Sequence, residues 1–209
     1  MEQQYLNRLD TDTETIISKS RFIAYIRRTP TEESAKAFIS DIKNLHKGAS
    51  HNCSAYIIGE SALIQKADDD GEPGGTAGVP ILEVLKQEGM YDTTIVVTRY
   101  FGGIKLGGGG LIRAYSGAAS SAVKASGKVV KIPVVPMEVT MEYTNTSRFE
   151  HYLGETDIEI RDTTYTDRVT YLLHVKEADR DAFTERLQEI TKNTHDLDEH
   201  DVIQAEGAV

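Results

Sequence analysis

The sequence predicts a two-domain α+β protein, and three observations support this fold class. The first part of the chain mixes strand-like runs with amphipathic helical segments, and a short run with two prolines, I-P-V-V-P at 132–136, follows it. The remainder has the order β-α-β-β-α-β, which is that of a ferredoxin-like sandwich. A chain of 209 residues is long enough for two modest cores. We expect domains at 1–132 and 137–209, joined by a linker at 133–136.

The first domain begins with a strand region and a helix. Residues 15–26 carry β-branched and aromatic side chains in partial alternation, which predicts a strand or a bent pair of strands. Thr31 precedes two glutamates and an apolar stripe with helical spacing, and Gly48 follows the stripe. We therefore expect a helix that Thr31 caps and that ends near Gly48.

A strand, its partner and a long loop come next. The alternation of residues 51–59 places His51 and Cys53 on one face of a strand, and residues 62–67 are the expected hairpin partner. The following D-D-D-G-E-P-G-G-T-A-G, residues 68–78, contains three like charges, a proline and four glycines. This composition predicts a loop.

The first domain ends with two further helices around a buried strand. Thr76 is expected to cap a helix that ends at Gly89, and T-T-I-V-V-T at 93–98 predicts a short buried strand. A glycine-rich segment runs from Thr98 to Tyr115. From about Gly110 onwards, small and apolar residues predict a second long helix.

The second domain is predicted from clean alternation and amphipathic spacing. We expect helices and strands in the order strand 137–143, helix 146–154, strands 158–165 and 169–175, helix 178–191 and a last strand near Val202. Four side chains of the first strand are predicted to face the core: Met137, Val139, Met141 and Tyr143.

Charge and composition limit the classes of partner. The net charge is −10, but residues 1–132 hold 16 Lys and Arg against 15 Asp and Glu, a net +1, and residues 133–209 hold 7 against 18, a net −11. The second part should therefore bind nucleic acid poorly by itself. No apolar run approaches the roughly 18 residues that cross a bilayer, and the amino terminus lacks a signal-peptide layout, so we expect a cytoplasmic protein with no membrane partner. The single cysteine, Cys53, excludes an internal disulfide.

The glycine segment T-R-Y-F-G-G-I-K-L-G-G-G-G-L-I-R-A-Y has two interpretations. Unpaired amides at the helix start could face an anion, with Arg99, Lys105 and Arg113 adding positive charge. The segment matches neither a P-loop nor GxGxxG. Alternatively, the glycines form a tight corner where the backbone passes close to a neighbouring element. The residues alone leave both interpretations open.

The acidic loop also has two interpretations. Its carboxylates could bind Mg²⁺ or Ca²⁺, but they are consecutive rather than alternating, and successive side chains in a turn diverge. We favour an arrangement in which Asp69 or Glu72 pairs with Arg99 or Arg113 and holds the two loops together. No metal site and no cofactor are predicted.

Other reactive or aromatic side chains give weaker signals. His51 and Cys53 lie two residues apart on one strand, which is too far for a direct bond between a nucleophile and its base. Tyr100, Phe101 and Tyr115 could stack on nucleic-acid bases. Because aromatic side chains usually pack, we expect Phe101 to lie in the core. No catalytic residue is assigned.

Two blocks carry a family resemblance. D-D-G-E-P-G-G-T-A-G (Asp69 to Gly78) and V-V-T-R-Y-F-G-G-I-K-L-G-G-G-G-L-I-R-A-Y (Val96 to Tyr115) resemble the signature blocks of the IMPACT family, in its bacterial YigZ-like branch, and H-N-C-S-A-Y is similar to that family's His-x-Cys strand. The resemblance covers nearly the whole chain. It implies a first domain similar to the second domain of a small-subunit ribosomal protein, with a split β-α-β core. It also implies a second domain similar to a late domain of elongation factor G.

The resemblance implies a class of function as well. Eukaryotic relatives act in translational control through an extra amino-terminal interaction domain that this chain lacks, so that partner is not carried over. For the bacterial branch it implies association with nucleic acid or the ribosome, without established catalytic residues. The positions that match the two blocks are expected to form one surface: Asp69, Asp70, Gly71, Glu72, Pro73, Gly75, Thr76, Gly78, Arg99, Gly102, Gly103, Gly107, Gly110 and Tyr115.

We therefore expect a translation-linked regulator whose first domain associates with RNA or the ribosome. The acidic second domain would modulate that contact or bind a basic protein. The expected ligand contacts are Asp69, Asp70, Glu72, Thr76, Arg99, Tyr100, Gly102, Gly103, Lys105, Gly107, Gly110, Arg113 and Tyr115. The alternative is an enzyme acting on a small phosphorylated or nucleotide-like substrate between the two loops, with Asp70 or Glu72 as base or metal ligand. A third possibility is a pure protein-interaction module.

Overall fold

The first part of the chain is built on a five-stranded antiparallel sheet. The computed structural model describes residues 3–208, and the chain divides between Val130 and Lys131 into two compact units. The strands of the first unit's sheet lie in the order β2-β3-β6-β4-β5. Their bounds are β2 Thr11–Ile17, β3 Ser20–Arg28, β4 His51–Ile58, β5 Ile64–Asp68 and β6 Thr93–Tyr100.

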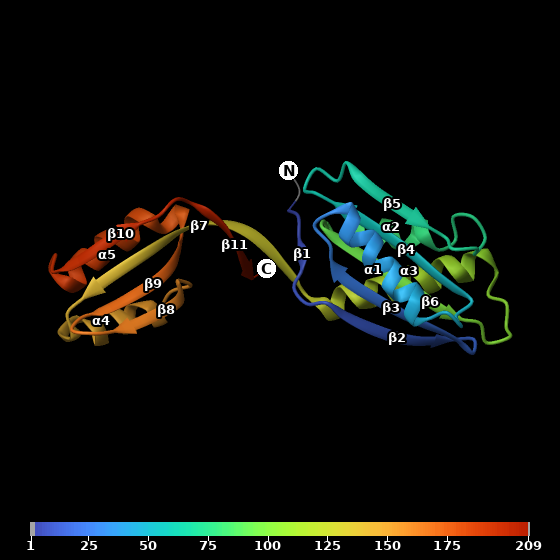
Figure 1. Ribbon diagram of the computed structural model, residues 1–209, viewed down its shortest axis with the longest axis horizontal. Helices are drawn as coiled ribbons and strands as arrows, with labels where there is room; N and C mark the ends of the chain where they lie inside the picture. Colours follow the sequence, from blue (N-terminus) through green and yellow to red (C-terminus); the bar gives the residue numbers. More distant parts are fainter. Residues whose placement is uncertain (1–2, 209) are drawn as a thin grey trace. The chain divides into compact units, whose positions relative to one another are not determined.

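Helices cover both faces of this sheet (Figure 1). Helix α1 (Glu32–Leu45) packs on one face, where Phe38 and Ile42 contact Val96 of β6. Helices α2 (Gly78–Gln87) and α3 (Gly107–Ser126) pack on the other face, over the larger core. The first unit is therefore a three-layer arrangement with its sheet in the middle.

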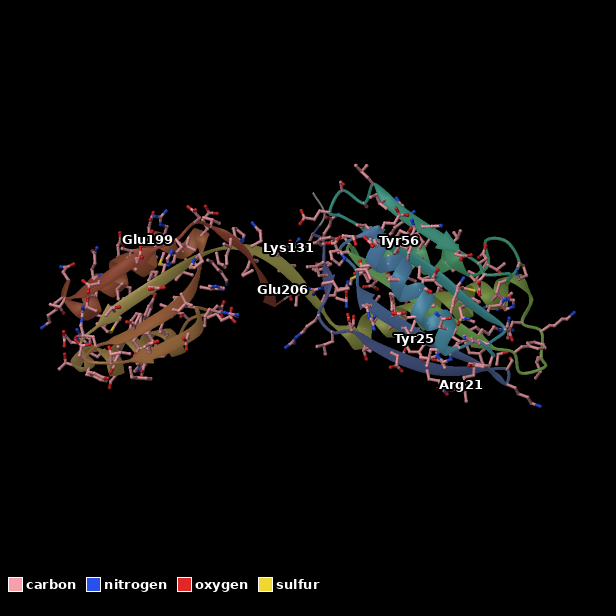
Figure 2. All side chains as sticks on the ribbon, viewed as in Figure 1. Arg21, Tyr25, Tyr56, Lys131, Glu199 and Glu206 are labelled. Carbon is pink, nitrogen blue, oxygen red and sulfur yellow. The ribbon has the colours of Figure 1, made fainter. Side chains whose placement is uncertain are left out.

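Several elements of the first unit confirm the expectations from sequence. The strand region at 15–26 forms the hairpin β2–β3, with Ser18 and Lys19 at its turn. The Thr31 hydroxyl caps α1 by accepting a hydrogen bond from the Ser34 amide at 3.1 Å. The expected alternation holds in β4, because its odd-numbered residues join the α2–α3 core while Tyr56 faces α1 and donates to Glu32 at 2.7 Å (Figure 2).

Two expectations about helix starts are wrong. Thr76 does not cap α2, because its hydroxyl donates to the Pro73 carbonyl at 2.6 Å and the residue before α2 is Ala77. Helix α3 begins at Gly107 rather than near Gly110, so the four consecutive glycines form its first turn. Both expectations rest on general preferences: threonine is common at helix caps, and glycine is uncommon inside helices.

The second unit has the expected ferredoxin-like order. Strands β7 (Lys128–Met141), β8 (Glu159–Tyr165), β9 (Val169–Lys176) and β10 (His195–Glu199) pair antiparallel in the order β10-β7-β9-β8. Helices α4 (Tyr143–Gly154) and α5 (Arg180–Thr191) connect them, with a short 3₁₀ helix (Glu177–Asp179) before α5. Both helices contribute to one core through Phe149, Leu153, Phe183, Leu187 and Ile190. Strand β1 (Leu6–Asn7) pairs with the start of β7, and β11 (Ile203–Ala208) also pairs with β7.

The first strand of this unit differs from its expected course. Residues 133–136, expected as a linker, lie within the continuous strand β7, because the extended backbone that proline favours is compatible with a strand. Met137, Val139 and Met141 are fully buried as expected. Tyr143 is not, because β7 ends at Met141 and Tyr143 begins α4 with 49% of its surface exposed. Among residues 3–208, no helix is both long and apolar enough to span a bilayer.

Candidate functional site

The acidic loop supplies the anion that closes the start of α2. One oxygen of Asp69, Oδ1, accepts hydrogen bonds from the amides of Ala77 at 3.0 Å and Gly78 at 2.8 Å, and Oδ2 accepts from Gly75 at 2.8 Å. Burial alone would raise the pKa of Asp69, but these amide bonds outweigh it and hold the pKa below its ordinary value. Asp69 is therefore a structural carboxylate that compensates the helix start.

Asp70 fastens the same loop to two other elements. Its Oδ1 lies 2.7 Å from Lys43 Nζ of α1, and its Oδ2 accepts from the Asn52 amide of β4 at 2.6 Å. Its backbone carbonyl lies 2.9 Å from His51 Nδ1, and because a carbonyl only accepts, that ring nitrogen carries the hydrogen. Both carboxylate oxygens of Asp70 are therefore already engaged.

Glu72 and Arg99 form the expected pair between the two loops. Arg99 Nη1 lies 2.6 Å from Glu72 Oε1, and only 6% and 4% of the two side chains are exposed. The Tyr115 hydroxyl donates to the same Oε1 at 2.8 Å, and burial raises the pKa of that hydroxyl far above its usual range. His51 Nε2 lies 3.8 Å from the other oxygen, Oε2. The Arg99 guanidinium is therefore paired with Glu72 inside the protein and is not available to an external anion.

Cys53 is a buried structural thiol. Its Sγ donates to the Asp69 carbonyl at 3.0 Å, and no part of the side chain is exposed. Burial raises the pKa of Cys53 to about 12. Since the thiolate is the nucleophile, this thiol is poorly suited to covalent catalysis.

The loop that follows β6 is a tight corner at its first glycine. A Cβ on Gly102 would lie 2.0 Å from the carbonyl group of Lys19, so only glycine lets the loop pass the β2–β3 turn. The Phe101 amide donates to Ser50 Oγ at 3.1 Å, and the Gly102 amide donates to Ser20 Oγ at 3.2 Å. The corner interpretation is correct for this part of the glycine segment.

The start of α3 is open, unlike the corner. Gly107 has a φ of +70°, which favours glycine, and Leu106 at the cap position makes no side-chain hydrogen bond to the helix. The first turn contains no acidic residue. A Cβ on Gly108 would approach only Thr76 Cγ2, at 3.9 Å, so the acidic loop lies beside this turn without covering it. Among the described residues, no carboxylate accepts a hydrogen bond from the first amides of α3, in contrast to the start of α2.

Three exposed cations flank this helix start. Lys105 precedes it, Lys19 lies in the turn that Gly102 contacts, and Arg113 lies one turn into α3. Arg113 Nη1 would be 3.6 Å from a Cβ on Gly109, so its guanidinium reaches back over the first turn. Within residues 3–208, these three side chains form no ion pair. We call residues 19, 101–110 and 113 the α3 surface.

The remaining predicted residues are distributed differently. Tyr100 belongs to the other face of the sheet, where its hydroxyl lies 2.9 Å from His46 Nδ1 and Arg21 of β3 stacks over its ring at 5.7 Å. Figure 2 marks Arg21 on this strand. Gly103 and Gly110 belong to the α3 surface, whereas Glu72, Arg99 and Tyr115 lie buried beneath the loops.

The expected position of Phe101 is wrong, and Lys19 is absent from the ligand contacts expected from sequence. Phe101 is 49% exposed rather than part of the core, because β6 ends at Tyr100 and the chain then leaves the sheet. Lys19 carried no signal of its own. A polar S-K-S turn indicates a hairpin, but only the pairing of β3 with β6 brings that turn to Gly102.

The acidic side chains at this site are engaged within the protein, whereas the lysine and arginine side chains of the α3 surface are exposed. Within residues 3–208, no group of three or more His, Cys, Asp or Glu side chains is arranged to hold a metal ion. The carboxylates of Asp69, Asp70 and Glu72 already bond to amides or cations. What remains free to meet a ligand is a helix start with exposed lysine and arginine side chains around it.

Comparisons with known protein families match both units. Residues 18–123 match the model of the Impact N-terminal domain, and residues 139–194 match that of a domain of unknown function, DUF1949. A solved structure titled as that of a hypothetical protein is 33% identical, has a TM-score of 0.60, and the match covers 94% of this chain and 97% of that one.

Curated relatives carry the same family name. The chain is 46% identical to IMPACT family member YvyE of Bacillus subtilis over 94% of this chain and 90% of that one. It is 35% identical to IMPACT family member YigZ of Escherichia coli over 87% and 90%. Protein IMPACT homolog of Saccharomyces cerevisiae is 34% identical, but over 42% of this chain and 35% of the yeast protein. With these matches over most of its length, the chain belongs to the IMPACT family.

Proposed function

We propose that this protein is a cytoplasmic, translation-linked regulator that associates with RNA or the ribosome by holding phosphate groups at the α3 surface. The observation that carries the proposal is the open start of α3, which has four glycines and no acid in its first turn. Amides at a helix start favour negative charge, and glycines let a phosphate approach them closely. Lys19, Lys105 and Arg113 add the cations that neutralise phosphates in RNA complexes.

The charge distribution supports an RNA contact confined to the first unit. Residues 1–132 carry a net +1, from 16 basic and 15 acidic residues, whereas residues 133–209 carry −11, from 7 and 18. In the acidic loop beside the site, Asp70 and Glu72 are paired with Lys43 and Arg99, and Asp69 accepts from amides at the start of α2. The enzyme alternative has less support, because neither Asp70 nor Glu72 is free to act as a base.

The proposal is tested by titrating a fluorescein-labelled 20-nucleotide RNA against the full chain at two salt concentrations. Affinity should fall steeply as salt rises, because phosphate neutralisation releases counterions. Arg113→Ala and Lys105→Ala should each weaken binding and reduce the salt slope by about one. Lys124→Ala is the matched control, because Lys124 is an exposed cation in the last turn of the same helix.

Three results would count against this proposal. RNA affinity could be absent, it could be indifferent to salt, or Lys124→Ala could weaken binding as much as Arg113→Ala does. The last result would mean that total charge, rather than the start of α3, determines binding. Arg99→Ala is unsuitable as a test, because it would leave Glu72 buried without its partner.

A second contact surface is supported in the acidic unit. Its helices pack on one face of the sheet, and on the other face Glu138 of β7 and Asp198 of β10 lie directly opposite each other. Asp162 belongs to the same face by register, and so does Asp196, which is paired with Arg168. Like charges opposite each other destabilise a sheet, whereas a cationic partner would relieve their repulsion. We propose that this face contacts a basic protein segment.

This second proposal is tested with a labelled lysine-rich peptide. Glu138→Gln combined with Asp198→Asn should weaken peptide binding and also raise the stability of the free protein. The matched control is Asp181→Asn combined with Glu185→Gln on α5, which removes the same charge elsewhere in the second unit. Equal loss in both double variants would show that only net charge matters, and would overturn the proposal.

A further inference from the structure

A stack of three side chains runs from the core of the first unit to the α3 surface. The Arg99 guanidinium carbon lies 5.4 Å from the centroid of the Phe22 ring and 5.4 Å from the centroid of the Phe101 ring. Phe22 is fully buried, Arg99 is 5% exposed and Phe101 is 49% exposed. The stack therefore ends on an aromatic ring that is open to solvent.

The open part of that ring is the face turned away from Arg99. The guanidinium lies over one face of Phe101, and Arg99 itself is almost entirely covered. Water therefore reaches Phe101 from the opposite face and the edge. No aromatic ring of residues 3–208 stacks on Phe101 from that side, so a planar group from outside the chain could occupy the position.

The cation beneath the ring selects the kind of group that would stack there. A ring face is negative, but a guanidinium on one side withdraws part of that charge from the system. The outer face of the Phe101 ring should therefore bind a second cation less favourably than an electron-rich planar group. A nucleobase has such a π-face, and base–aromatic stacking needs no particular sequence.

The backbone that carries the ring is also held in place before any ligand arrives. The Phe101 amide donates to Ser50 Oγ, and the next amide, of Gly102, donates to Ser20 Oγ. Arg99 is fixed from below by its pair with Glu72. An aromatic platform that is already ordered loses little conformational entropy on binding, which favours affinity.

We propose that Phe101 is a stacking platform for one unpaired nucleobase, so that the RNA held at the α3 surface is single-stranded. This inference rests on the proposed function, because the phosphates beside that base would be those held by the start of α3. Bases inside a duplex are stacked and paired, and so cannot be laid on a protein ring. Stacking on Phe101 would favour single-stranded over duplex RNA, and the cations would contribute most of the affinity.

The test compares a labelled single-stranded RNA with a duplex of the same length, using the full chain. Wild type should bind the single strand more tightly. Phe101→Leu keeps an apolar side chain but removes the ring, and it should weaken single-strand binding by about fivefold or more while leaving duplex binding unchanged. Leu63→Ala is the control, because Leu63 is an exposed apolar side chain (85%) in another loop of the first unit, outside the α3 surface, and should change neither affinity.

The outcomes separate this inference from the function on which it rests. If RNA binding depends on salt and on Arg113 but Phe101→Leu binds the single strand as wild type does, stacking is overturned and the phosphate site stands. Equal wild-type affinity for single strand and duplex also overturns stacking. If no RNA binds, both proposals fail. A thermal unfolding curve for Phe101→Leu that matches wild type excludes misfolding as the cause of a loss.

Discussion

Helices α2 and α3 pack on the same face of the first sheet, yet only the start of α2 has a side chain that accepts hydrogen bonds from its amides. The start of α2 is closed by Asp69, whose carboxylate accepts from the Ala77 and Gly78 amides. The start of α3 has neither a side-chain cap nor an acid in its first turn, and three exposed cations flank it. The chain therefore supplies its own anion at the start of α2, whereas the start of α3 is exposed and has cations around it.

The largest expected effect concerns the pair that holds the loops of the two helix starts together. Glu72→Ala removes the partner of Arg99 and the acceptor of the Tyr115 hydroxyl. Because a buried charge would remain unpaired, we expect the free energy of unfolding to fall by about 3–5 kcal/mol in urea titrations. Glu83→Ala, which breaks the exposed pair with Lys86, should change it by about 0.5 kcal/mol or less. A Glu72→Ala variant as stable as Glu83→Ala would show that the loops do not depend on this pair.

The next effect concerns the closed helix start. Asp69→Ala leaves three amides without their acceptor, and we expect a loss of about 2 kcal/mol in the free energy of unfolding. Asp69→Asn retains one acceptor oxygen and should lose less. Identical losses in the two variants would indicate that the side chain acts through packing rather than through hydrogen bonding.

The same carboxylate should make stability depend on pH. Hydrogen bonds from the Gly75, Gly78 and Ala77 amides lower the pKa of Asp69 in the folded state despite its partial burial. Its contribution is therefore complete above the ordinary pKa of about 4, and it is lost as pH falls through the lower folded value. The stability difference between wild type and Asp69→Asn, from urea unfolding at pH 7 down to pH 3, should shrink in that range. A difference that is constant with pH would contradict this role.

The smallest expected effect on stability is at the open helix start. Gly109→Ala should stabilise the protein by about 0.5–1 kcal/mol, because alanine loses less backbone entropy in a helix than glycine does. A Cβ at this position meets only the flexible end of Arg113, at 3.6 Å. Gly109→Asp should be at least as stable as wild type, because a carboxylate near a helix start is favourable by about 0.3–1 kcal/mol. Thermal unfolding of both variants checks this. A marked loss of stability in Gly109→Asp would show that the first turn of α3 does not accommodate a carboxylate.

Local patterns predicted the elements better than they predicted the site. The alternation in β4 and the cap of α1 depend on neighbouring residues, and both are present. The cap of α2 was assigned to Thr76 because it is adjacent, whereas Asp69 reaches the helix only through the turn of the acidic loop. The partner of Arg99 could not be chosen from sequence, because the choice depends on the register that sets Arg99 opposite His51. Phe101 was expected in the core, and its exposure follows from where β6 ends.

The most direct test of the central claim is the RNA affinity of Gly109→Asp measured beside Gly109→Ala across a range of salt concentrations. The two variants place a side chain at the same position and differ in charge. Our account predicts that Gly109→Asp stays folded but binds RNA about tenfold more weakly than Gly109→Ala at low salt, with a reduced salt slope. Equal affinity and equal salt slope for the two variants would contradict a phosphate site at the start of α3.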